Sequence, residues 1–208
     1  MQKNPSIELI FFDLGNVLVE IELDRFFHAM AAQTGMSKKK FKNRIKKLTP
    51  LYKAFECGQM SSHQFFQLFG ENFPLKSASY PDFVKDYTGI FEPNQELFSW
   101  CRILRQQVRL SIISNTDELH YQRIAEDYAL DELFEKPITS FRAGSRKPDP
   151  SIYDYALQQL GISPDRALLI DDRRENVLGA QQVGMHAILY ANNRKLKRDL
   201  HRFFLQIP

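Results

Sequence analysis

One stretch near the start of the chain, from Glu8 to Val19 (ELIFFDLGNVLV), restricts the possible folds more than any other. Its apolar run from Leu9 to Phe12 is too short to span a membrane and too continuous for a strand with one face in water. It predicts a buried strand that ends at Asp13. Ligands of open α/β sheets bind at that edge, and Gly15 would let the following turn approach a bound anion closely. The alternative is an ordinary surface turn that contains one aspartate.

Composition indicates a folded chain with a substantial core. A length of 208 residues with 43% hydrophobic side chains allows one domain of ordinary size plus a modest insertion. The formal charge of +3 is a weak bias, so neither a nucleic acid nor a membrane is an expected partner. Cys57 and Cys101 form no CxxC pair, and the start of the chain has no apolar region of signal-peptide length. We therefore expect a cytoplasmic protein.

The two halves of the chain have different patterns. Residues 20–92 contain apolar and aromatic positions at helical spacing and no convincing strand. From residue 93 onwards, predicted helices alternate with short strands such as VRLSIISN, ALLIDD and HAILY. This alternation is typical of an α/β fold with a parallel sheet and right-handed crossovers, in which the helical block is an insertion after the first strand.

Polar side chains lie where three of the predicted strands end: Asp13, then Ser114 with Asn115, then Asp171 with Asp172. A parallel sheet would bring these groups to one edge. Carboxylates this close repel one another unless a cation lies among them, and a set of oxygen ligands without cysteine or clustered histidine favours Mg²⁺. Lys147 supplies a further positive charge. The set therefore offers a phosphoryl group a nucleophile, a metal and a lysine.

Four segments, FFDLGNVL, IISNT, RKPDP and LLIDDRRENVLGA, resemble the four ordered motifs of the haloacid dehalogenase superfamily. The match runs from Ile10 to Ala180 in the right order. The resemblance implies a Rossmann-like core, residues 1–19 and 93–208, with an all-helical cap at residues 20–92. The form FDLGNV, together with Glu56, Gly58 and Ser61, is most similar to the branch that contains glucose-1-phosphate phosphatases.

The resemblance also implies a role for each matching residue. Asp13 would be the nucleophile that forms an aspartyl-phosphate and would contact the metal, Asp172 would bind Mg²⁺ directly, and Asp171 would support the metal indirectly or share its ligation. Ser114 and the Asn115 amide would bind the phosphoryl oxygens, Lys147 would neutralise Asp13 and the transferred group, and Asn176 would anchor the metal loop. As alternatives, Ser114 and Asn115 form an ordinary strand-to-helix cap, and Asn176 is a helix cap.

Gly15 departs from the family pattern, because most phosphatases of this superfamily have an acid/base aspartate at that position. Its backbone carbonyl can still be a metal ligand, but it has no side chain for proton transfer. The predicted function is a Mg²⁺-dependent phosphomonoesterase for a small phosphorylated metabolite, with a sugar phosphate as one candidate. One alternative is a catalytically silent module that binds a phosphorylated ligand or a protein. Another is a metal-independent 2-haloacid dehalogenase, although the pair Asp171 and Asp172 counts against it.

Three weaker signals have structural interpretations. The lysine-rich segment from Ser37 to Leu48 is typical of a solvated helix face. Leu196, Leu200, Phe203 and Phe204 have helical spacing in the tail, so they either bury against the core or pair two chains, which allows a monomer or a homodimer. Glu20 is either a hinge residue or a substitute acid, and no histidine is predicted to be catalytic.

Overall fold

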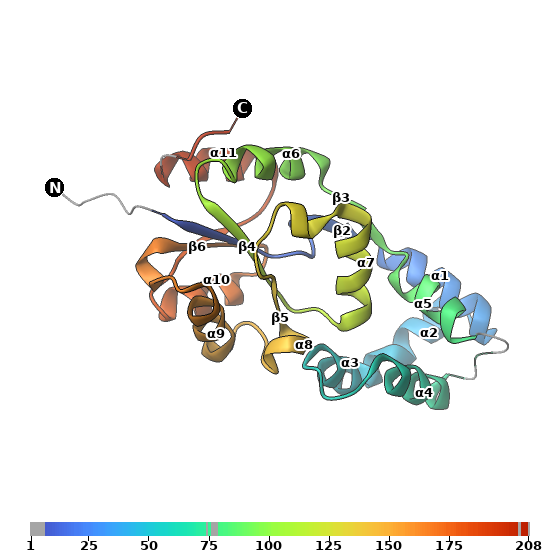
Figure 1. The fold of residues 1–208 in the computed structure, drawn as a ribbon. Coiled ribbons are helices and arrows are strands. Elements are labelled where there is room, and N and C mark those ends of the chain that lie inside the picture. Colours follow the sequence, from blue (N-terminus) through green and yellow to red (C-terminus); the bar gives the residue numbers. More distant parts are fainter. Residues whose placement is uncertain (1–6, 74, 76–78, 204, 208) are drawn as a thin grey trace.

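The computed structural model describes residues 7–73, 75, 79–203 and 205–207, and its centre is a parallel sheet of five strands (Figure 1). The strand order is β5-β4-β1-β6-β7. The strands are β1 (Leu9–Phe12), β4 (Arg109–Ser114), β5 (Ile138–Thr139), β6 (Ala167–Asp171) and β7 (His186–Leu189). The register pairs Phe12 with Ile112 on one side and with Ile170 on the other. The carboxyl ends of β1, β4 and β6 therefore meet at one edge.

Strand β1 is central because its side chains are apolar on both faces. Ile10 and Phe12 belong to one buried cluster, and Leu9 and Phe11 belong to another. All four side chains have no measurable exposure, with relative accessibilities of 0%. This confirms the predicted buried strand and places Asp13 directly at its end.

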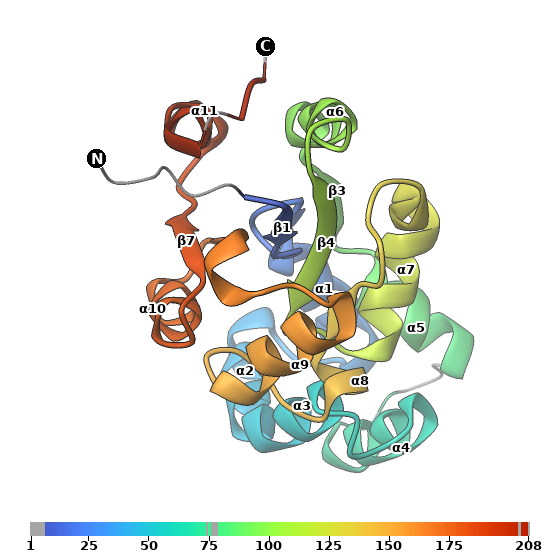
Figure 2. The same ribbon diagram turned by 60° about the vertical axis from the view of Figure 1, so that its left-hand side comes forward.

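Helices cover both faces of the sheet (Figure 2). One face packs against α6 (Gln95–Leu104), α7 (Glu118–Tyr128) and α11 (Asn193–Leu200). The other packs against α9 (Pro150–Leu160) and α10 (Arg174–Gln182). Short turns of helix lie between these elements, namely α8 (Ser140–Ala143), η2 (Leu130–Glu132) and η3 (Pro164–Arg166), and a further one, η4 (His201–Phe203), follows α11. The predicted α/β fold with a parallel sheet is confirmed.

The helical block consists of α1 (Leu23–Thr34), α2 (Lys38–Ile45), η1 (Lys46–Leu48), α3 (Thr49–Glu56), α4 (Ser62–Asn72) and α5 (Tyr80–Thr88). It lies beside α7 and α8 and away from α6 and α11 (Figures 1 and 2). Its core is mostly aromatic: Phe26, Phe41, Phe55, Phe65, Phe69, Phe73, Phe83 and Tyr87. Leu119 of α7 belongs to the same cluster, so the block packs directly on the sheet domain. The domain boundaries at 19/20 and 92/93 stay a prediction.

The prediction that residues 20–92 contain no strand is wrong at both ends of the block. Val19–Ile21 (β2) and Phe91–Pro93 (β3) form a two-stranded antiparallel ribbon where the chain leaves and re-enters the sheet domain. Each strand has three residues, too few to show a period in the sequence. The helix that follows the ribbon begins at Gln95, because the Asn94 side chain caps it.

The tail buries against the core. Leu196 and Leu200 are 1% and 0% exposed in the cluster that contains Phe12. Phe204 lies outside the described residues. Among the helices that the structure describes, none has the length and apolar character needed to cross a membrane.

Candidate active site

The sheet brings three carboxylates together at its carboxyl edge. Oxygen atoms of Asp13, Asp171 and Asp172 all lie within 4.8 Å of one another. Asp13 follows β1, Asp171 is the last residue of β6 and Asp172 follows it, so the parallel pairing of these strands brings the three together. A single cation could contact all three residues, and the oxygen-only donor set suits a hard divalent ion.

Lys147 is the positive charge of the site. Its Nζ lies 3.1 Å from Asp13 Oδ1 and 2.5 Å from Asp171 Oδ2, and its side chain is fully buried. Asn115 holds the lysine loop in place from the end of β4. Its side-chain Nδ2 donates to the Lys147 carbonyl at 2.9 Å, and its Oδ1 accepts from the Lys147 N–H at 2.8 Å. The Asn115 side chain therefore positions the loop that carries Lys147.

Asp13 is buried, and this controls its charge. Burial raises the pKa of its carboxyl to about 6, against the attraction of Lys147 and with help from the negative charge of Asp171. The Leu14 N–H donates to Asp13 Oδ1 at 2.7 Å, and this bond favours the ionised form. With a pKa of about 6 Asp13 is mostly ionised at neutral pH, and a cation bound beside it would favour the ionised form further.

The two aspartates at the end of β6 have different surroundings. Asp171 is completely buried and accepts hydrogen bonds from the Arg173 N–H at 2.9 Å and from Asn176 Nδ2 at 3.0 and 3.1 Å, besides the Lys147 contact. Asp172 is only half-buried, and its Oδ2 accepts from Asn16 Nδ2 at 3.2 Å. Asp172 is therefore the carboxylate more accessible to a cation, whereas Asp171 contacts Lys147 and Asn176. Asn176 lies inside α10, which begins at Arg174 after an N-cap at Arg173, so Asn176 is not its cap.

The remaining predicted residues lie around this cluster. Ser114, at the end of β4, is 2% exposed. The connection after it is fixed by Ser140, whose Oγ accepts from the Thr116 N–H at 3.0 Å and donates to the Thr116 carbonyl at 3.1 Å. Gly15 lies in the turn after Asp13, where a Cβ would approach Ile21 Cδ1 to 2.9 Å. Glu20 is exposed on β2, opposite Glu92 of β3.

The sequence interpretation missed a buried polar cluster beside this edge. His120 Nδ1 lies 2.8 Å from Asp117 Oδ2, and the Tyr87 hydroxyl donates to the same oxygen at 2.8 Å. Glu56 pairs with Arg146, the neighbour of Lys147, at 3.0 Å. Asp117 and His120 are three residues apart at the start of α7, a spacing that indicates a capping aspartate but not its partner in the helical block.

Comparisons with known proteins agree with this geometry. Residues 7–184 match the model of the haloacid dehalogenase-like hydrolases, so the chain belongs to that family. The wild-type structure of a family enzyme from Bacteroides thetaiotaomicron, in complex with magnesium and inorganic phosphate, superposes with a TM-score of 0.79 at 22% identity, over 91% of this chain and 98% of that one.

Two curated relatives are phosphatases by name. The D-ribitol-5-phosphate phosphatase of Bacteroides thetaiotaomicron is 21% identical over 201 residues, which cover 93% of this chain and 97% of that protein. The sesquiterpene phosphatase astK of Aspergillus oryzae is 27% identical over 135 residues, 64% of this chain and 69% of that protein. The predicted superfamily is therefore confirmed, whereas the glucose-1-phosphate branch stays a prediction.

Proposed function

We propose that this protein is a Mg²⁺-dependent phosphomonoesterase that transfers a phosphoryl group from a small phosphate ester to Asp13 and then to water. The observation that carries the proposal is the buried contact of Asp13 with Lys147, beside two further carboxylates within 4.8 Å. The names of the two curated relatives support phosphate esters as the substrate class.

The residues fit a magnesium ion by their chemistry. Asp13, Asp172 and the carbonyl of Gly15 would hold it, with Asp171 as a further ligand or as the support of the metal loop. The ion would offset the negative charge of the three carboxylates and of the phosphoryl oxygens. The raised pKa of Asp13 is consistent with a site that needs this extra charge.

The chain's own residues would carry out the transfer in two displacements. The Asp13 carboxylate forms a bond to phosphorus while the bond from phosphorus to the ester oxygen breaks, and the alcohol departs with a proton from the surroundings. Water then attacks the aspartyl-phosphate, which releases phosphate and restores the carboxylate. Lys147, the Ser114 hydroxyl and the Asn115 N–H would stabilise the phosphoryl oxygens.

The finer features of the proposal rest on the resemblance. Residues 20–92 would form a cap that controls access to Asp13 and selects the substrate. The resemblance to the glucose-1-phosphate branch makes a sugar phosphate one candidate substrate among small phosphate esters. We further propose a cytoplasmic protein, monomeric or homodimeric, with no nucleic-acid partner.

The test is hydrolysis of p-nitrophenyl phosphate with Mg²⁺ and with EDTA, with Asp13→Asn as the inactive control. Metal-dependent release that is absent in the variant supports the proposal. A silent binding module would instead show thermal stabilisation by inorganic phosphate without turnover. A dehalogenase would release halide from 2-haloacids at a rate that EDTA does not change.

A further inference from the structure

A cavity of about 330 Å³ lies between the helical block and α7. This volume is within the range of small-molecule sites. Most of its wall is apolar or aromatic: Leu23, Phe26, Phe27, Ile45, Tyr52, Tyr87 and Ile90. Its polar lining residues are Lys46, Thr49, Glu56, Asp117 and His120.

The strongest polar groups in this cavity are already satisfied by one another. Both ring nitrogens of His120 face acceptors, since Nδ1 lies 2.8 Å from Asp117 Oδ2 and Nε2 lies 3.0 Å from the Tyr87 carbonyl. An imidazole that bonds two acceptors carries both protons, so His120 and Asp117 form a buried ion pair. Tyr87 completes the pair by donating to Asp117. This cluster has little capacity left to bind the hydroxyls of a ligand.

Besides Lys46 and Thr49, which are exposed, two groups of the lining can bind a ligand. Tyr52 lines the cavity, and its buried hydroxyl has no hydrogen-bond partner within the part of the chain that the structure describes. Buried hydroxyls are normally satisfied, so an unpaired one beside a cavity indicates a missing partner. Glu56 pairs with Arg146 through Oε2, and a carboxylate can accept further hydrogen bonds. The cavity therefore offers a mostly apolar wall with hydrogen-bonding capacity at Tyr52 and Glu56, four residues apart on α3.

The walls of the cavity continue from the segments that form the Asp13 site. Asp117 follows Ser114 on the same connection at the carboxyl edge of the sheet. Glu56 contacts Arg146, the neighbour of Lys147. Leu23 follows β2, whose first residue, Val19, is bridged to Gly15. The cavity is thus connected through these segments to the Asp13 site, and an ester whose phosphoryl group lies at Asp13 could place its alcohol part there.

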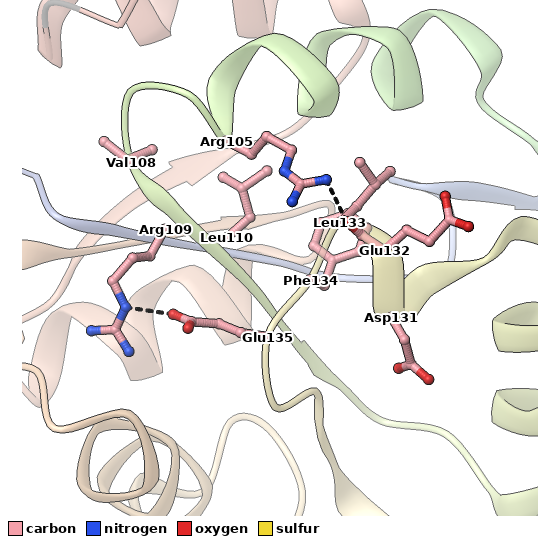
Figure 3. A pocket seen from close by; sticks show the side chains of 9 residues that line it. All are labelled: Arg105, Val108, Arg109, Leu110, Asp131, Glu132, Leu133, Phe134 and Glu135. Atoms are coloured by element: carbon pink, nitrogen blue, oxygen red, sulfur yellow. Dashed lines mark hydrogen bonds and ion pairs between the residues drawn. The ribbon is translucent and has the colours of Figure 1, made fainter.

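A second pocket, of about 220 Å³, is a poorer candidate (Figure 3). It lies at the amino end of β4, opposite the carboxylate cluster. Arg105 donates to the Glu132 carbonyl and Arg109 pairs with Glu135, both at 2.5 Å. Its cationic side chains are therefore engaged within the protein.

We propose that the cavity holds the alcohol part of the substrate, and that the preferred substrates are phosphate monoesters with an apolar or aromatic body and a single polar group, rather than polyhydroxylated sugar phosphates. This inference rests on the proposed phosphatase function. A sugar would bury several hydroxyls against Phe26, Phe27 and Ile90, where they would lose their bonds to water without replacement. A single ligand hydroxyl could pair with Tyr52 or Glu56.

The test compares esters of primary alcohols, whose leaving groups are of similar basicity: 3-phenylpropyl, 3-(4-hydroxyphenyl)propyl and 3-hydroxypropyl phosphate. We expect kcat/KM to be at least about tenfold higher for the two aromatic esters than for 3-hydroxypropyl phosphate, mainly through a lower KM. The corresponding phosphonates, titrated calorimetrically with Mg²⁺ present, should show the same order of affinity. Tyr52→Phe should remove the advantage of the hydroxyphenyl ester over the phenyl ester.

Leu23→Glu provides a variant that places a charge at the cavity without disturbing the core, because Leu23 is 51% exposed. It should reduce the ratio of kcat/KM between the phenyl and hydroxypropyl esters. Leu68→Glu is the matched control, since Leu68 is 36% exposed on α4 and does not line the cavity. This control should leave the ratio unchanged.

The outcomes separate the two proposals. Turnover of p-nitrophenyl phosphate together with equal or better use of the hydroxypropyl ester would overturn the substrate class and leave the phosphatase function intact. An equal effect of Leu23→Glu and Leu68→Glu would show that the cavity does not bind the alcohol. Absence of metal-dependent turnover for every ester would overturn the phosphatase function, and this inference with it.

Discussion

Gly15→Asp tests whether the chain lacks a general acid for the leaving group. The new carboxyl would stand two residues after Asp13, where most phosphatases that resemble this chain have an aspartate. The backbone accepts the change, because Gly15 is not among the residues with positive φ. The obstacle is steric, since the new Cβ would lie 2.9 Å from Ile21 Cδ1 and 3.7 Å from Ile21 Cγ1.

The expected gain exceeds the steric cost. The close contact is with the terminal methyl of a half-buried side chain, so a change of Ile21 conformation relieves it at about 0.5–1.5 kcal/mol. General acid catalysis contributes about 10²–10⁴ in rate, or about 3–5 kcal/mol of barrier. Simple alkyl phosphates, which have the most basic leaving groups, should therefore be hydrolysed about a hundredfold faster or more. Aryl phosphates should change little, because their leaving groups need no proton.

The assay is single-turnover formation of the aspartyl-phosphate across substituted phenyl and alkyl phosphates. For the wild type we expect the rate to fall steeply as leaving-group pKa rises, with sugar 1-phosphates intermediate, and for Gly15→Asp we expect a shallower slope. Gly15→Asn is the matched control, since it meets the same Ile21 contact without an acid. A flat wild-type slope, or identical slopes for Gly15→Asp and Gly15→Asn, would refute the reasoning and indicate another proton donor. The first candidate is Glu20, which Glu20→Gln would test.

Three further predictions concern the buried charges. Asp13→Asn should abolish turnover yet stabilise the metal-free protein at pH 7 by up to about 3 kcal/mol. The reason is that the pKa of Asp13 is raised from 3.8 to about 6, so folding opposes its ionisation. Urea unfolding in EDTA should show that the stability difference between variant and wild type vanishes below pH 4. Lys147→Met should lower the free energy of unfolding by about 3 kcal/mol or more at pH 8, and by less at pH 5, where Asp13 takes up a proton. Lys85→Met, at an exposed lysine, should change the free energy of unfolding little. Equal losses in the two variants would contradict the role of Lys147 as counter-charge. Burial opposes the charge of His120, but the attraction of Asp117 outweighs it and raises the His120 pKa above 6.5. The stability lost in His120→Gln should therefore be largest below pH 6.5 and disappear as the pH rises through the raised pKa. A stability difference that does not depend on pH would contradict the ion pair.

The core of the fold was predictable because its signals are local. Four consecutive apolar residues before Asp13 identify a strand buried on both faces, and the structure pairs this strand in parallel with β4 and β6. The β2 and β3 ribbon was not predictable, because three-residue strands leave no period and Glu20 faces a like charge, Glu92. Its pairing depends on where the helical block rejoins the sheet domain.

The candidate site was predictable to the extent that strand ends determine it. Asp13, Asp171 and Asp172 lie together because two adjacent parallel strands end there. The different surroundings of Asp171 and Asp172 were not predictable, because they depend on burial and on which hydrogen-bond donors lie next to each carboxylate. Lys147 and the Asn176 amide engage Asp171, whereas Asp172 stays half-exposed.

The polar cluster of Asp117, His120 and Tyr87 shows why specificity is harder to predict than chemistry. Asp117 and His120 come from the sheet domain and Tyr87 from the helical block, so the cluster exists only when the two parts are packed together. The same packing creates the cavity lined by Tyr52 and Leu23. It follows that substitutions at the strand ends should change the rate of phosphoryl transfer for every ester, whereas substitutions in the cavity should change which ester is preferred. A variant such as Leu23→Glu that slowed all esters equally would show that the cavity acts on the reaction and not on the choice of substrate.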